Sequence, residues 1–206
     1  WARANGCPWD HVTAIEAARC GNLEILEWAT QNGCSLTEEV SAEAAAFGHL
    51  HVLKWLRLHD CPWGASVCAA AAEQGQIPAL AWMKSFGCPW DEASCARAAG
   101  AGDLHTLQWL RSKGCPWDQT TSDAAAAEGH IHVLQWASSN GCVLGRSTSL
   151  CAAEEGRLEV LHWLLLHGCP WNQDACMEAA FMNGELQVYS WIQALPEPSS
   201  SCAPEE

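Results

Sequence analysis

The stretch GCPWD at Gly6–Asp10 places a cysteine between a glycine and a proline, and it recurs at Gly87–Asp91 and Gly114–Asp118. A cysteine can be a nucleophile, a metal ligand or half of a disulfide. In a turn it can also serve as a small buried apolar side chain. The spacing of the cysteines along the chain helps to separate these four roles.

Three residue types recur at an interval of 27 residues, which indicates a repeat architecture of about seven units. The cysteines are Cys7, Cys34, Cys61, Cys88, Cys115, Cys142 and Cys169. The tryptophans are Trp1, Trp28, Trp55, Trp82, Trp109, Trp136 and Trp163. The glycines are Gly21, Gly48, Gly75, Gly102, Gly129 and Gly156, and the last copy is shifted by one residue to Gly184 and Trp191.

Stacked helical layers would separate equivalent cysteines by roughly 8–10 Å. A disulfide needs Cα atoms within about 7 Å, and zinc ligands converge to about 2.3 Å from one ion. Successive members of the Cys7 column therefore cannot bridge layers or share a metal, and we interpret them as packing residues. The total of 13 cysteines is odd, and free thiols favour a reducing compartment. We expect an intracellular, cytoplasmic protein with no cofactor.

The 206-residue chain has a formal net charge of −14 and only ten Lys and Arg, which argues against nucleic acid and anionic membranes. No apolar run approaches the roughly 18 residues that span a bilayer. The chain begins inside a repeat and without a methionine, so we expect a fragment. We assign residues 1–193 to the repeat array and residues 194–206, rich in Pro, Ser and Glu, to a disordered tail.

Each unit reads as two helices joined by a tight turn, with no strand. The residue three after each cysteine favours a helix N-cap: Asp10, Thr37, Gly64, Asp91, Asp118, Gly145 and Asn172. An Ala-Ala pair follows in every copy, as at Ala17-Ala18, and the glycine column then ends the helix. A second segment such as NLEILEWA at Asn22–Ala29 has an apolar stripe with helical period.

The segments AARCGNLEILEWATQNG (Ala17–Gly33) and AAEEGRLEVLHWLLLHG (Ala152–Gly168) resemble the ankyrin repeat. They match the core Ala-Ala-x-x-Gly-His-x-x-hydrophobic-hydrophobic-x-x-Leu-Leu-x-x-Gly of that family, with Trp in place of the first late Leu. His49 and His130 match the histidine after the glycine. The resemblance extends from Trp1 to about Trp191 and implies an all-α, ankyrin-like solenoid.

Two departures from that family concern the linker. Ankyrin repeats have 33 residues and carry a Thr-Pro-Leu-His signature. The repeat is shorter here, that signature is missing, and only GCPWD-like residues join one unit to the next. We therefore expect the β-hairpins of the family to be reduced to tight loops.

The sequence motifs give little support for metal binding or catalysis. His49-x-His51 and His130-x-His132 have metal-like spacing, but residues two apart on a helix point to different sides. No phosphate-binding loop, nucleophile elbow or His-Glu-x-x-His is present. We predict that the protein is not an enzyme, and a Cys/His metal protein or an enzyme remains the less favoured alternative.

Binding to another protein is the favoured function, because repeat arrays expose a long continuous surface. The resemblance implies that the first helices line the concave side. Their positions away from the Ala-Ala face vary, and we predict partner contacts there: Glu16, Arg19, Glu39, Glu43, Glu73, Arg97, Glu154, Asp174, Glu178 and Phe181. The excess of acids suggests a partner protein with a basic segment and argues against nucleic acid and membranes as partners. We expect the chain to bind this partner as a monomer. The alternative is a passive structural spacer, whose variable positions are merely solvated.

Overall fold

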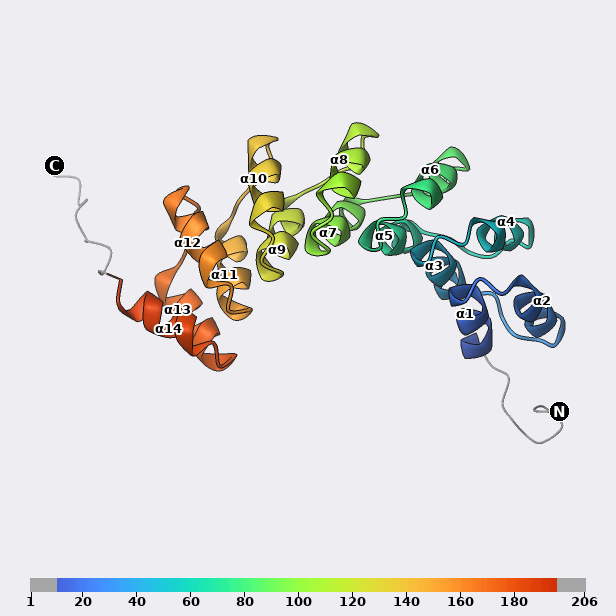
Figure 1. Cartoon of the computed structure of the whole chain (residues 1–206), viewed down its shortest axis with the longest axis horizontal. Coiled ribbons are helices and arrows are strands. Elements are labelled where there is room, and N and C mark those ends of the chain that lie inside the picture. The colour runs from blue at the N-terminus through green and yellow to red at the C-terminus, as the bar shows by residue number, and fades with distance from the viewer. Residues whose placement is uncertain (1–10, 196–206) are drawn as a thin grey trace, which may run out of the picture.

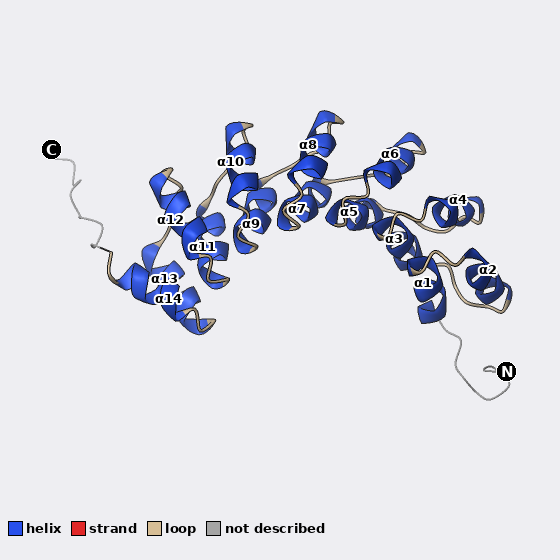
Figure 2. Cartoon of the chain, in the orientation of Figure 1, coloured by secondary structure: helices blue, strands red, loops and turns tan. Residues whose placement is uncertain are grey.

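The structure is a computed structural model that describes residues 11–195, and this part of the chain contains fourteen helices and no strands (Figure 2). The first helices of the units are α1 (His11–Arg19), α3 (Glu38–Ala46), α5 (Ala65–Glu73), α7 (Glu92–Gly100), α9 (Gln119–Ala127), α11 (Arg146–Glu154) and α13 (Gln173–Met182). The second helices are α2 (Leu23–Gln31), α4 (Leu50–Leu58), α6 (Ile77–Ser85), α8 (Leu104–Ser112), α10 (Ile131–Ser139), α12 (Leu158–Leu166) and α14 (Leu186–Gln193). The predicted all-α repeat solenoid is confirmed.

The repeats stack into an arc, with most of the first helices on its inner side and the second helices outside (Figure 1). Each first helix packs directly on the first helix of the next unit, from α1 to α13. Each second helix packs chiefly on the first helix of its own unit. The first helices therefore hold the array together, and the second helices cover their outer side.

The starts of the first helices follow the predicted N-caps. Thr37, Gly64, Asp91, Asp118, Gly145 and Asn172 are the residues that cap α3 to α13, whereas Asp10 lies outside the described residues. Asp91 accepts a hydrogen bond from the Ala93 amide at 3.1 Å, and Asp118 accepts one from Thr120 at 2.9 Å. These oxygens satisfy amides that the first turn leaves without a helical partner.

The ends of the first helices depend on the glycine column. Gly21 has a φ of +68°, in the left-handed region where a side chain is disfavoured. Its amide bonds the Ala18 carbonyl at 3.1 Å, and the Asn22 amide bonds Ala17 at 2.8 Å, which is the pattern of a Schellman motif. The predicted helix-ending role of this column is confirmed at Gly21.

The core lies between the two layers of helices, with mostly small residues from the first helices and larger ones from the second helices. The Ala-Ala pairs are buried from Ala17-Ala18 to Ala152-Ala153, as are leucines of the second helices such as Leu26 and Leu134. The loop tryptophans are only half-buried at its edge. Trp63 meets Trp82 of α6 edge-to-face, with ring centroids 5.9 Å apart, so it covers the seam between layers.

The two terminal segments were assigned from the sequence alone. The first GCPWD copy lies outside the described residues, and so does residue 196 onward of the predicted tail, residues 194–206. Within residues 11–195, no helix is long and apolar enough to cross a membrane.

One loop residue breaks the pattern of glycines before the cysteine column. Asp60 has a φ of +53° where the other repeats have glycine, for example Gly33 at +93°. Both turns close with the same bond, from Cys61 N to Leu56 O and from Cys34 N to Ala29 O, each 3.0 Å long. A non-glycine residue in this conformation costs roughly 1–2 kcal/mol, with Asp among the better tolerated.

We therefore expect Asp60→Gly to raise the free energy of unfolding by about 0.5–1 kcal/mol, because glycine relieves the backbone strain. Urea denaturation measures this change. Gly33→Asp is the matched reverse substitution, since no atom lies within 4 Å of a Cβ built at Gly33 and only the backbone conformation changes. A gain in stability from Gly33→Asp would contradict the explanation.

The third position of the first helices contains a buried hydroxyl without a partner in two repeats, at Ser94 and at Thr121. Thr121 is fully buried and its Oγ1 makes no hydrogen bond, whereas the equivalent residues Val40 and Val67 are apolar. Burying a hydroxyl without a bond costs about 1–3 kcal/mol. We expect Thr121→Val to stabilise the array by about 1 kcal/mol in the same denaturation experiment.

Thr148 is the matched control for that substitution, because it occupies the same position in the next repeat and is also fully buried. Its Oγ1 donates to Asp123 Oδ1 at 2.6 Å and accepts from the Gly145 amide at 3.1 Å. Thr148→Val should therefore destabilise the array by about 1–2 kcal/mol. Equal effects of the two substitutions would show that hydrogen bonding is not the cause.

Candidate functional site

The column of loop cysteines has a structural partner in the preceding layer. The sulfur of Cys61 donates to the carbonyl of the N-cap residue Thr37 at 3.3 Å, and Cys88 donates to Gly64 at 3.5 Å. The same contact recurs at Cys115, Cys142 and Cys169. All five are buried, which confirms the packing role and adds a weak interlayer hydrogen bond that the sequence did not reveal.

Most of these thiols are poor nucleophiles at neutral pH. Burial raises the pKa of Cys61, Cys142 and Cys169, and it raises the pKa of Cys176 to about 11. A thiol must be ionised before it can attack a substrate or bind a metal. The eleven cysteines of residues 11–195 are free of disulfides.

The two His-x-His pairs connect neighbouring repeats. His49 Nε2 contacts the carbonyl of Arg19 at 2.9 Å, and His51 Nε2 contacts that of Gly21 at 2.9 Å. His130 and His132 bond Gly100 and Gly102 in the same way, at 3.0 and 3.1 Å. These carbonyls end the preceding first helix, so the histidines cap it from the next layer. The second histidine of each pair, His51 or His132, is exposed and still makes this contact.

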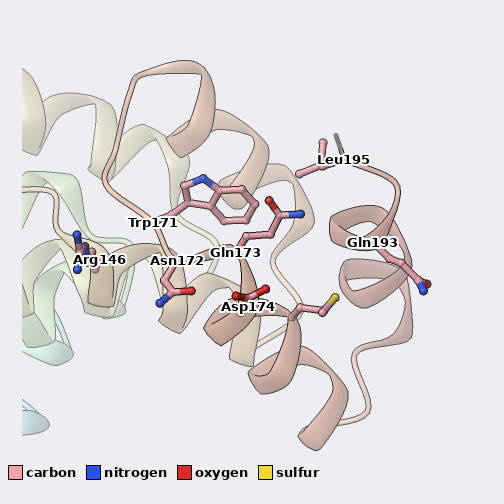
Figure 3. A pocket seen from close by; sticks show the side chains of 8 residues that line it. Arg146, Trp171, Asn172, Gln173, Asp174, Gln193 and Leu195 are labelled. Atoms are coloured by element: carbon pink, nitrogen blue, oxygen red, sulfur yellow. The ribbon is translucent and has the colours of Figure 1, made fainter. Parts of the chain in front are cut away.

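The described residues offer no converged set of metal ligands. Between residues 11 and 195, no three His, Cys, Asp or Glu side chains come together where a metal ion could lie. A pocket of about 670 Å³ lies at the C-terminal end of the array against Trp171. Figure 3 shows its polar residues Arg146 and Gln193 at opposite ends, with Trp171 between them. Asn172, Gln173 and Asp174 lie between these two residues in the same pocket.

The ten residues predicted to contact a partner all lie on first helices. Arg19, Glu73, Glu154 and Phe181 share one position of the repeat, while Glu16, Glu43, Arg97 and Glu178 share another. Glu39 and Asp174 share a third position, one turn nearer the helix start. Each of the ten is exposed or half-buried. Helix α9 contributes none of them, because Thr120, Ala124 and Ala127 occupy its equivalent positions.

These positions line a groove where the helices α5, α7 and α9 meet. Its volume is about 410 Å³, and it contains the predicted residues Glu73 and Arg97. The structure adds seven residues that the sequence analysis missed: Ala96, Gly100, Ala101, Thr120, Ala124, Ala127 and Glu128. We call the ten predicted residues together with Thr120, Ala124, Ala127 and Glu128 the inner face. Comparing whole repeat columns, rather than charged residues alone, would have found Gly100, Thr120, Ala124 and Ala127, but not Glu128.

Ion pairs involve both arginines of the predicted set. Arg97 lies 3.3 Å from Glu73 on the preceding helix, and Arg19 lies 3.6 Å from Glu16 on its own helix. The third ion pair of residues 11–195 joins Arg157 to Glu128 at 3.6 Å. All three are well exposed, so each contributes little to stability. The positive charge of each of these arginines is therefore balanced by a neighbouring glutamate.

Charge is distributed unequally between the two layers of helices. The first helices contain ten acidic and three basic residues, a net charge of −7. The second helices contain three acidic and four basic residues, a net charge of +1. Three of the four bases lie over loop tryptophans at 4.0–4.5 Å from the ring centroid: Arg57 on Trp63, Lys84 on Trp90 and Arg111 on Trp117. The acidic charge is therefore concentrated on the inner helices.

The interlayer histidine bond can be tested in one repeat column. His132→Ala removes the bond to Gly102, and we expect a loss of about 0.5–1 kcal/mol in the free energy of unfolding. His105 occupies the same position one repeat earlier, and no bond from its ring to a preceding carbonyl is found within residues 11–195. His105→Ala should change stability by much less. Equal losses in urea denaturation would mean that the histidine stabilises only its own helix.

No protein-family model matches the sequence, and no curated protein matches it either. The fold resembles that of the human ASB11 ankyrin repeat domain, with a TM-score of 0.59 and 16% sequence identity. The match covers 89% of this chain and 98% of that domain. At this identity the similarity is one of fold, and it agrees with the helix-turn-helix units, the Ala-Ala pairs and the glycine turns. The chain folds as an ankyrin-like array of helical repeats.

Proposed function

We propose that the chain is a non-catalytic protein-binding module that holds a basic segment of another protein along its inner face. The observation that carries this proposal is the concentration of negative charge on the first helices. The outer layer, built from the same repeat, is nearly neutral. Net charge for solubility alone would not require one layer to hold it.

The middle of the inner face is suited to close approach by a partner. Alanine and glycine occupy most of the groove over α7 and α9, at Ala96, Gly100, Ala124 and Ala127. Small side chains let another backbone come near the helices, and Glu73 and Glu128 also line this groove. A basic segment in this groove would meet acidic side chains along its length. Complementary charge of this kind increases specificity and the rate of association.

We extend the proposal to the oligomeric state and the cellular location of the protein. We infer that it acts as a monomer, because the inner face of a single array already forms a continuous surface. We place it inside the cell, in the cytoplasm, since its many unpaired thiols suit a reducing compartment. Neither inference affects the identity of the partner segment.

The test compares two variants with the same change in charge. One carries Glu43→Lys, Glu154→Lys and Glu178→Lys on the inner face, and the other carries Glu24→Lys, Glu27→Lys and Glu159→Lys on second helices. None of these six residues belongs to an ion pair found within residues 11–195. A partner captured from cell extract by the unchanged array is purified, and its affinity for each variant is measured by calorimetry.

We expect the inner-face variant to bind at least about tenfold more weakly, a change of about 1.4 kcal/mol, and the outer variant to keep its affinity. Binding should also weaken as salt is added. Equal loss in both variants would show attraction to net charge only. Retention by both would place the partner elsewhere, and the absence of any partner would favour a structural spacer.

A further inference from the structure

The loop cysteines have a second neighbour, which is a side chain twenty residues earlier on the first helix. This neighbour is Ser41 for Cys61 and Ser149 for Cys169. The Ser41 Oγ donates to the Cys61 Sγ at 3.1 Å, and the Ser149 Oγ donates to the Cys169 Sγ at 3.5 Å. The repeat thus brings the terminal atoms of these two positions into direct contact.

In two central repeats the serine is replaced by cysteine, so sulfur lies beside sulfur. These pairs are Cys68 with Cys88 and Cys95 with Cys115, whose thiols occupy the two positions that meet in the Ser41–Cys61 pair and interact with each other. All four side chains are at most 1% exposed. Each contact joins a cysteine of a first helix to a cysteine of the loop column. The separation of roughly 8–10 Å between layers applies only to cysteines within the same column.

We propose that Cys68–Cys88 and Cys95–Cys115 are oxidisable dithiols that close to intramolecular disulfides when the protein reacts with a peroxide. In the first step a thiolate sulfur attacks a peroxide oxygen, the O–O bond breaks, and a sulfenic acid and water form. In the second step the neighbouring thiol attacks that sulfur, and the hydroxide that leaves takes the thiol proton as water. Two thiols are oxidised to one disulfide, and one peroxide is reduced to two waters.

The two members of the first pair have different roles in this reaction. The neighbouring Cys68 thiol lowers the pKa of the Cys88 thiol, and the positive charges of Arg57 and Lys84 act in the same direction. The same interaction raises the pKa of Cys68. Cys88 is therefore the thiol that attacks peroxide, and Cys68 is the one that resolves the sulfenic acid.

Each disulfide would tie a first helix to the loop that precedes the next one. Cys68 lies on α5 and Cys88 in the loop before α7, while Cys95 lies on α7 and Cys115 in the loop before α9. These are the three helices that form the central groove of the inner face. Oxidation would thus fasten the middle of the array and leave its ends unchanged.

The experiment treats the native chain with hydrogen peroxide, blocks the remaining thiols, and maps the disulfides by peptide mass spectrometry. We expect disulfides between Cys68 and Cys88 and between Cys95 and Cys115, each with the loss of two hydrogens, and a rise in melting temperature that a reductant reverses. The proposal fails if the four thiols stay reduced, or if they pair only after the chain is unfolded in urea. It also fails if they pair with other cysteines.

Two variants separate a paired geometry from general reactivity. Cys68→Ser reproduces the Ser41–Cys61 arrangement that another repeat already contains, so it should fold and lose the first disulfide alone. Ser149→Cys should create a third pair with Cys169 and form a new disulfide. Absence of that bond in a folded Ser149→Cys variant would show that this contact between columns does not suffice.

Discussion

The close packing of one first helix on the next is the interaction on which the rest of the array depends. Small side chains make it possible, since the Ala-Ala pairs are buried from Ala17-Ala18 to Ala152-Ala153 and let successive helices approach. The second helices have tryptophan and leucine in place of alanine, and they pack chiefly within their own unit. A layer of small residues occupies less length than a layer of large ones. The array therefore bends toward its first helices, as Figure 1 shows.

This bend determines what each side of the protein can do. The basic side chains of the outer layer mostly contact aromatic side chains of the array itself, because Arg57, Lys84 and Arg111 lie on the loop tryptophans. Its histidines reach back to the preceding repeat, as His49 does to Arg19. The inner layer needs only its alanine positions for stacking, so its remaining positions are free to vary. The exposed residues of the inner layer can therefore change without loss of the fold, as expected of a repeat array.

The sequence predicts most of the fold because its signals act within one turn. An N-cap such as Asp91 and a helix-ending glycine such as Gly21 fix helix boundaries locally, so both could be identified without knowledge of the packing. The contacts between layers were harder to predict, since they join different columns. The bond from His132 to Gly102 and the pairing of Cys68 with Cys88 depend on how far one layer is rotated against the next. For the same reason the candidate face was predicted by its charges, and its uncharged centre on α9 was missed.

Repetition also explains why exceptions in this chain are informative. When one position serves the same purpose in every unit, a different residue there must either cost stability or serve another purpose. Asp60 belongs to the first kind, because its left-handed backbone gains nothing from a side chain that points to solvent. Cys68 and Cys95 belong to the second kind, since serine fills the same place in other repeats with an equally good contact to the loop cysteine. Cysteine also fills this place at Cys176 in the last unit, so packing tolerates it there. What distinguishes the two adjacent repeats under the central groove is that each such cysteine meets a loop cysteine, which makes the chemistry of sulfur available.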